Sequence, residues 1–286
     1  MKWHFGLIKW PPDLSRLDSF VRCGQGQSNS SKRTSEGWRL WVEAVEKEEC
    51  AGKKASNHLE SIKLLSFANV LEPLADKEIN WLAQNTTERS FDTGDIVYTP
   101  ADACMVIFLV LTGAIRIYGM MGRQELTFDV FRTGAIFGEA SLMARTQDEY
   151  AQALEPSRVG LLNRTAFWHL VSQHPEVKAR LVRLLGDRLR RSRSRMTDIA
   201  LKEVPARLAS LILELMQSEG VVTREGHYKI PARYTQEQLA TMIGAKRVAV
   251  SKAFGKLQDS GCVRLWRRQI YVIDLAALRC IASATD

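Results

Sequence analysis

The spacing of apolar residues between Arg89 and Leu162 predicts a series of short β-strands. Apolar or alternating runs recur about every 8 to 12 residues, and glycines stand between them. Antiparallel strands joined by tight turns, as in a roll or barrel, produce this pattern. The runs are Ile96–Tyr98, Val106–Leu111, Ala114–Tyr118, Leu126–Phe131, Ala135–Phe137 and Val159–Leu162, and the glycines are Gly94, Gly113, Gly122 and Gly134.

From Pro175 to Ile199 the apolar period changes to that of a helix. One face of this segment is apolar and the rest is strongly cationic, and proline is a favoured first residue of a helix. A helix this long with one apolar side is a natural seam between two copies of a chain. The predicted seam residues are Leu181, Leu185, Leu189 and Met196.

A pair of short helices is predicted between Thr235 and Gly261. Thr235 and Gln238 have the spacing of a capping box, and Gly244 can end the helix that they begin in a left-handed turn. A second apolar set at helical spacing then starts at Arg247. The two apolar sets are Leu239, Ala240 and Ile243, and then Val250, Ala253, Phe254 and Leu257. The pattern predicts a helix-turn-helix.

After Gly261 the chain alternates in the manner of a β-hairpin. Cys262–Trp266 and Ile270–Ile273 are the predicted strands, and Arg267 and Arg268 form a basic turn between them. Such a hairpin beside a helix-turn-helix is typical of a wing.

These elements define an α+β protein. We expect a flexible N-terminal extension at 1–58, a jelly-roll-like antiparallel β-roll at 59–174, a dimerisation helix and hinge at 175–202, and a winged helix-turn-helix at 203–286. The extension holds the Gly/Ser-rich segment Gly24–Gly37 and several tryptophans. It is either a partner-binding arm or the product of an upstream start codon, and the sequence leaves both interpretations open.

Positive charge is concentrated in the C-terminal part. Residues 180–286 hold 20 Lys and Arg against 10 Asp and Glu, a net +10, whereas residues 1–179 hold 20 against 22, a net −2. This distribution favours double-stranded DNA as the partner. An acidic membrane is less consistent, since no lipid-anchoring signal is present.

The second predicted helix leaves a polar face outside its apolar stripe. Recognition helices contact base edges mainly with their first residues, although a merely solvated face is the simpler alternative. The predicted base-reading residues are Arg247, Val248, Ser251 and Lys252, and the predicted DNA-backbone contacts are Thr235, Gln236, Lys246, Arg267 and Arg268.

Other classes of protein find little support. No apolar run approaches the roughly 20 residues of a spanning helix, and the first residues do not resemble a signal peptide, so we expect a cytoplasmic protein. The five cysteines form no CxxC pair, and His169 and His174 are poorly spaced for one metal. No hydrolase, nucleotide-hydrolase or dinucleotide motif occurs. We expect no metal, no cofactor and no enzymatic activity.

From about Leu59 to Ala282 the chain resembles the Crp/Fnr family of bacterial transcription regulators. The matching motifs are Gly94-Asp95, Leu111-Thr112-Gly113, Gly134 with Phe137-Gly138-Glu139, the hinge-like Glu203-Val204-Pro205, and Thr235–Gly261. The resemblance implies a homodimer on a two-fold symmetric DNA site, an effector pocket inside each roll, and RNA polymerase as a possible partner.

One triplet departs from the cyclic-AMP-binding members of this family. They carry Arg-Ser-Ala where this chain has Glu149-Tyr150-Ala151, and the arginine neutralises the cyclic phosphate. A carboxylate there turns an attraction of about 4 kcal/mol into a similar repulsion at an effective dielectric near 20. We therefore predict that cyclic AMP is not the effector. The candidate pocket residues are Gly138, Glu139, Glu149, Tyr150, Arg188 and Arg193.

The effector itself stays open at this stage. Arg188 lies near the position where the family's cyanobacterial nitrogen regulator holds 2-oxoglutarate, so a small dicarboxylate is one candidate effector. The alternative is that the arginines of this helix form a solvated basic face and bind no ligand. A haem or thiol redox sensor using Cys104 or His169 is another, although the cysteine cluster of the iron-sulfur members is missing. A third interpretation of the function, a regulatory module of an enzyme, is remote because catalytic motifs are missing.

Overall fold

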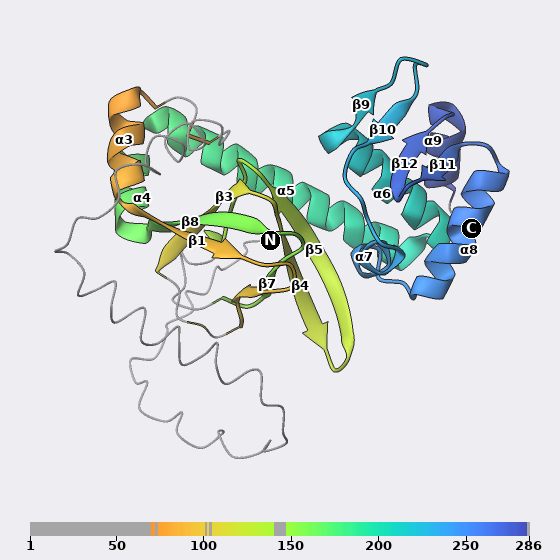
Figure 1. Cartoon of the computed structure of the whole chain (residues 1–286), viewed down its shortest axis with the longest axis horizontal. Coiled ribbons are helices and arrows are strands. Elements are labelled where there is room, and N and C mark those ends of the chain that lie inside the picture. Colours follow the sequence, from red (N-terminus) through yellow and green to blue (C-terminus); the bar gives the residue numbers. More distant parts are fainter. Residues whose placement is uncertain (1–69, 72–73, 101, 103–104, 140–146, 285–286) are drawn as a thin grey trace, which may run out of the picture. The chain divides into compact units, whose positions relative to one another are not determined.

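The computed structural model describes residues 70–71, 74–100, 102, 105–139 and 147–284. Its N-terminal half is a roll of two four-stranded antiparallel sheets (Figure 1). One sheet has the order β1 (Thr86–Phe91), β8 (Ser157–Asn163), β3 (Val106–Thr112) and β6 (Ile136–Phe137). The other has the order β2 (Ile96–Tyr98), β7 (Tyr150–Ala153), β4 (Ala114–Met121) and β5 (Gln124–Arg132). The predicted β-roll is confirmed.

The predicted apolar runs all lie in strands, and the glycines between them turn the chain. Gly94, Gly113, Gly122 and Gly134 have φ between +63° and +93°, which other residues rarely adopt. Two strands were missed. β1, with the sequence TTERSF, contains a single large apolar residue because it is an edge strand. β7 buries only the two alanines Ala151 and Ala153.

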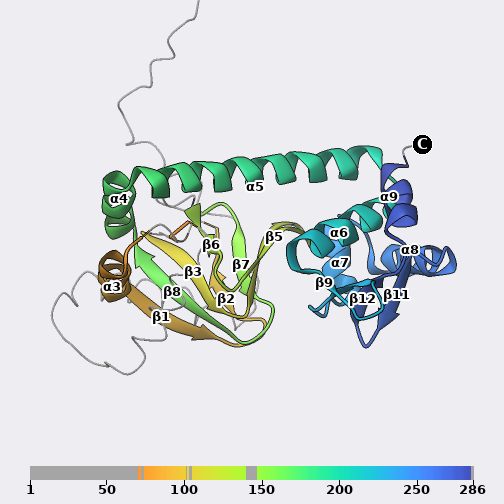
Figure 2. The same cartoon turned by 90° about the horizontal axis from the view of Figure 1, so that it is seen from above.

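Three helices pack against the first sheet of the roll (Figure 2). They are α3 (Asp76–Gln84), α4 (Arg164–Gln173) and the predicted long helix α5 (Pro175–Leu201). Val177 and Leu181 at the start of α5 are buried in this core. Leu181 was expected in a seam between copies of the chain; it packs instead on its own roll, because the first turns of α5 run beside α4.

The C-terminal domain is built around α6 (Val204–Glu219), α7 (Gln236–Met242), α8 (Arg247–Asp259) and α9 (Leu275–Ser283). Its sheet has the order β11 (Val263–Trp266), β12 (Gln269–Val272), β10 (Tyr228–Ile230) and β9 (Val221–Val222). The predicted hinge Glu203-Val204-Pro205 is the N-cap and first turn of α6. The helix-turn-helix and the hairpin after it are confirmed.

Some predicted features lie outside the described residues, namely the extension 1–58 and Cys104. Within the described ranges, no helix combines the length and the apolar composition that crossing a bilayer requires.

Candidate functional site

The turn between α7 and α8 has the geometry that its sequence predicts. The Thr235 hydroxyl accepts a hydrogen bond from the backbone N–H of Gln238 at 3.1 Å, and the side-chain Oε1 of Gln238 accepts one from the backbone N–H of Thr235 at 2.8 Å. This reciprocal capping box fixes the start of α7. Gly244, with φ +61°, then reverses the chain so that α8 can begin at Arg247.

Arg207 on α6 supports this turn from behind. Its Nη1 donates hydrogen bonds to the carbonyls of Ile243 at 3.0 Å and Gly244 at 3.4 Å, at the end of α7 where helical carbonyls lack partners. No sequence pattern indicated this contact, because Arg207 and Ile243 belong to different elements.

One face of α8 is buried and the opposite face is exposed. Val250, Ala253, Phe254 and Leu257 lie in the core of the domain. The side chains predicted to read bases are all exposed: Arg247, Val248, Ser251 and Lys252. Val248 is 67% exposed, although valine side chains are usually buried. The exposed face therefore offers two cations, a hydroxyl and an apolar contact to the same partner.

The hairpin β11–β12 ends in a strained basic turn. Arg267 and Arg268 have φ of +50° and +63°, the left-handed region that two-residue hairpin turns require and that glycine and asparagine adopt more readily. Both side chains are exposed, and the Arg267 guanidinium lies 5.8 Å from the Trp266 ring. Arginine at these positions places two cations at the tip of the wing. Of the other predicted backbone contacts, Thr235 and Lys246 are exposed and Gln236 is half-buried.

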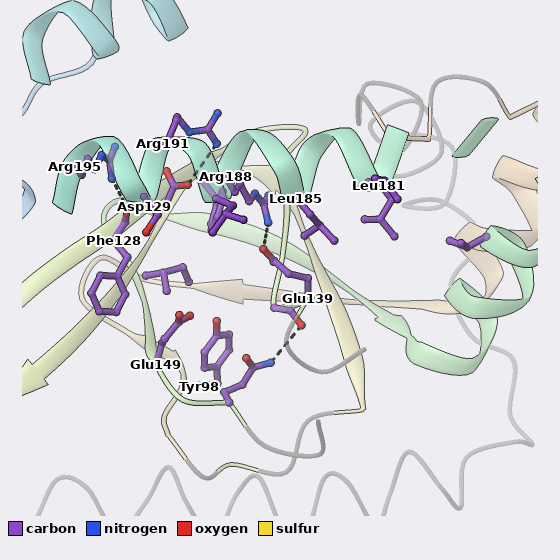
Figure 3. A pocket seen from close by; sticks show the side chains of 18 of the residues that line it. Tyr98, Phe128, Asp129, Glu139, Glu149, Leu181, Leu185, Arg188, Arg191 and Arg195 are labelled. Atoms are coloured by element: carbon purple, nitrogen blue, oxygen red, sulfur yellow. Dashed lines mark hydrogen bonds and ion pairs between the residues drawn. The ribbon is translucent and has the colours of Figure 1, made fainter. Parts of the chain in front are cut away.

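A second candidate site is a cavity of about 570 Å³ between the roll and α5 (Figure 3). Its size falls in the usual range for small-molecule sites. Most of its surface is apolar, and aromatic rings from three elements line it, those of Tyr98, Phe128, Phe131 and Trp168. Tyr98 and Phe131 also pack on the buried ring of Phe137, so this wall is fixed by the core of the roll.

On the side of the cavity next to α5, arginines of this helix pair with carboxylates of the roll. Arg188 binds the Glu139 carboxylate and the Ile136 carbonyl, and its guanidinium lies 4.4 Å from the Phe131 ring (Figure 3). Arg191 lies 3.7 Å from Asp129. Burial raises the pKa of the Asp129 carboxyl, and the three arginines Arg195, Arg191 and Arg188 oppose that rise.

Arg195 links α5 to two other elements. It binds Glu214 on α6 at 2.7 Å and the backbone carbonyl of Phe128 on β5. The cations nearest to Asp129 are therefore held by protein groups.

Glu149 lies on the other side of the cavity, beside Tyr98 (Figure 3). Its pKa is raised, first because burial penalises the charged form and then because the carboxylates of Glu139 and Asp148 repel it. Among the described residues, no cation is paired with it.

The structure brings together four of the six predicted pocket residues, Gly138, Glu139, Glu149 and Arg188. The other two do not line this cavity. The Tyr150 ring stacks on Tyr118, 5.1 Å away, and Arg193 is exposed without lining the cavity, because the helical period places Arg191 and Arg195 there instead. Asp129, which also lines the cavity, was not predicted because it is a single carboxylate within an otherwise apolar strand pattern. His169 contacts Trp81 on α3 and does not line the cavity.

The rest of the apolar stripe on α5 faces outward. Val182, Leu185, Leu189 and Met196 are exposed, Leu189 by 53% and Met196 by 67%. Val182, Leu185 and Leu189 also line the cavity. The stripe and the cavity therefore share residues.

A β-roll joined to a winged helix-turn-helix is the architecture of a class of DNA-binding proteins, and comparison with known proteins places the chain in a family. Residues 88–174 match the cyclic nucleotide-binding domain model, and residues 206–281 match the Crp-like helix-turn-helix domain model. The chain belongs to the Crp/Fnr family of DNA-binding transcription regulators.

Proteins that are similar to the chain over most of their own length are named as regulators. It is 26% identical over 218 residues to the CRP-like cAMP-activated global transcriptional regulator of Mycobacterium tuberculosis, covering 74% of this chain and 95% of that protein. It is 23% identical to the global nitrogen regulator of Synechocystis, over 66% of this chain and 85% of that one.

Solved structures share the fold. FixK2 from Bradyrhizobium japonicum aligns with a TM-score of 0.63 at 20% identity, over 70% of this chain and 99% of that one. A mutant of CooA from Carboxydothermus hydrogenoformans gives 0.63 at 24%, over 70% and 89%.

Proposed function

We propose that the protein binds a two-fold symmetric DNA site as a homodimer and reads its sequence with α8. The observation that carries this proposal is the exposed face of α8, which combines cations suited to guanine with a valine suited to the thymine methyl group. Arg267 and Arg268 on the wing then contact the phosphate backbone. RNA polymerase is a possible further partner in this function.

The homodimer is formed through the exposed stripe of α5. Leu185, Leu189 and Met196 would be buried between two such helices, which removes apolar side chains from water. Two recognition helices then meet half-sites whose centres lie about one helical turn of DNA apart, roughly 10 to 10.5 base pairs.

Two substitutions distinguish base reading from backbone contact. Arg247→Ala is expected to lose about 1 to 3 kcal/mol on the specific site and to relax selectivity at one base pair. Arg268→Ala is expected to weaken binding to specific and random DNA alike and to flatten the salt dependence. Affinities for both DNAs at several salt concentrations provide the measurement. Equal losses on both DNAs for Arg247→Ala would contradict its assignment to base reading.

Cyclic AMP does not control this regulator in our proposal. Several relatives are named as activated by cyclic AMP, but here a phosphate entering the cavity meets Glu149. The Glu139 carboxylate is already bound by Arg188, and a hydrogen bond to it, worth about 1.5 to 3 kcal/mol, does not replace a counter-charge for the phosphate. Calorimetry with 10 μM to 1 mM cyclic AMP is expected to give no saturable heat. A dissociation constant below about 10 μM with tighter DNA binding would contradict the proposal.

Two other effectors receive less support. A dicarboxylate such as 2-oxoglutarate would need Arg188, whose guanidinium already binds Glu139 and the Ile136 carbonyl. A haem or thiol sensor would need His169 or Cys104. His169 does not line the cavity, and Cys104 lies outside the described residues. A visible absorption band in the purified protein would favour the redox sensor.

A further inference from the structure

The carboxylates that line the roll cavity differ in their charged neighbours from one wall to the other. Two of its carboxylates, Asp129 and Glu139, have arginines of α5 as partners. Glu149 projects from the opposite wall, and the charged groups that act on it most strongly are Glu139 and Asp148, both acidic. A positive charge placed beside Glu149 would relieve this repulsion, whereas a negative charge would increase it.

The cations of the lining do not reverse this asymmetry. Arg188 and Arg195 each bind a carboxylate and a backbone carbonyl, and Arg191 faces Asp129. Lys178, which also lines the cavity, lies near the start of α5, nearly three turns before Arg188. An anion bound by Arg188, Arg191 or Arg195 would therefore have to displace an existing ion pair, and the remaining cation of the lining, Lys178, is exposed near the far end of the helix from Arg195.

The apolar part of the cavity indicates the body of the ligand. Tyr98 lies next to Glu149 but is only 1% exposed, whereas Phe128, which lies below Asp129 (Figure 3), is 42% exposed and offers its ring to a ligand. Flat aromatic faces favour an aromatic partner, and they attract cations as well. About 570 Å³ is enough for one or two fused rings with a short substituent.

We propose that the roll cavity binds an aromatic cation, a ring system carrying a protonated amine or amidine, with the cationic group at Glu149 and the ring against Phe128. The proposal rests on the proposed function in taking the roll as the effector site of the regulator. It assigns to that site a ligand of opposite charge to a cyclic nucleotide.

Three probes of nearly equal shape test the charge preference on the full chain. They are 2-naphthylmethylammonium, the neutral 2-naphthylmethanol and the anionic 2-naphthoate, each titrated by calorimetry at pH 7.5 up to about 5 mM. The ammonium is expected to bind about tenfold or more tightly than the carboxylate, since a charge-assisted hydrogen bond is gained in one case and a repulsion in the other.

Variants assign the preference to one residue. Glu149→Gln is expected to weaken the ammonium about fivefold or more and to leave the neutral alcohol within about twofold of the parent protein. Glu225→Gln is the matched control, because Glu225 lies on an exposed turn of the C-terminal domain and makes the same change in charge. It is expected to change neither affinity.

Three outcomes would overturn the proposal: equal or tighter binding of naphthoate, no binding of any probe, or an unchanged ammonium affinity in Glu149→Gln. None of these affects DNA recognition by α8, which is measured without any probe. If the probes fail but the protein still binds DNA sequence-specifically, only the ligand assignment is wrong. If sequence-specific DNA binding is absent, the proposed function itself is wrong.

Discussion

The C-terminal domain and the roll use arginine in opposite ways. On α8 and the wing, Arg247, Arg267 and Arg268 are exposed. Along the cavity, Arg188 and Arg195 bind carboxylates from other elements. An exposed cation remains available to a polyanion, whereas a paired one fixes the shape and the charge of a cavity. The number of basic residues in a segment therefore does not reveal which role they have.

The largest effect is expected from a substitution in α5, the helix that connects the two regions. Leu189→Glu places a charge in the exposed apolar stripe and is expected to dissociate the proposed dimer, because burying an unpaired carboxylate is costly. Affinity for the symmetric DNA site should then fall about 100-fold or more, as the two half-sites are no longer bound together. Sedimentation and gel-shift titrations measure both effects.

Ser194→Glu is the control for this change. It adds the same charge to an exposed position of α5 on the side away from the stripe. An equal loss of affinity in this variant would show that charge near the DNA, rather than dimer pairing, is responsible.

Two glycine substitutions in the roll separate the cost of overpacking from the cost of a positive φ. Gly138 has φ +76°, and a Cβ there would lie 2.6 Å from the buried Phe108 ring. Gly138→Ala is expected to lower the free energy of unfolding by about 2 to 4 kcal/mol, through both the positive φ and the overpacking. Gly122→Ala, with φ +63° and open space, should cost only about 1 to 2 kcal/mol. Urea unfolding that gave equal costs would contradict this reading of the cavity wall.

The corresponding test in the C-terminal domain removes the cap of α7. Thr235→Ala is expected to cost about 1 kcal/mol, since the N–H of Gln238 loses its acceptor. Thr235→Ser keeps the hydroxyl and should restore most of that stability. Hydrogen exchange should locate the loss in α7, and an effect spread over the roll would mean that the two regions unfold as one unit.

The smallest effect is a dependence of stability on pH. The pKa of Glu149 in the folded protein is raised above its ordinary value of 4.5, mainly by burial. The folded state therefore loses stability as pH rises from that value through the raised pKa, because it must then hold a buried carboxylate. Glu149→Gln should be more stable than the parent at pH 8, and the gain should vanish below pH 4.5. A constant difference across this range would contradict the burial of an ionised Glu149.

Local patterns predicted the DNA-binding half well. The capping box at Thr235, the left-handed Gly244 and the apolar stripe of α8 depend on residues within one or two turns of each other. The turn at Arg267 and Arg268 follows from the lengths of the two strands beside it. The helices α3, α6 and α9 were not predicted, although Asp274 caps α9 and a proline lies in the first turn of α6.

By itself the sequence determined most strands of the roll, though not β1 and β7, together with the long helix, the winged helix-turn-helix and the acidic residue at position 149. The tertiary structure decided which charges meet. Arg188 and Glu139 are 49 residues apart, and only the packing of α5 on the roll pairs them. The same packing buries Leu181 and brings Arg191 and Arg195 to the cavity in place of Arg193. Capping and periodicity act over a few residues, whereas ion pairs and cavities form between segments whose separation in the chain carries no local signal.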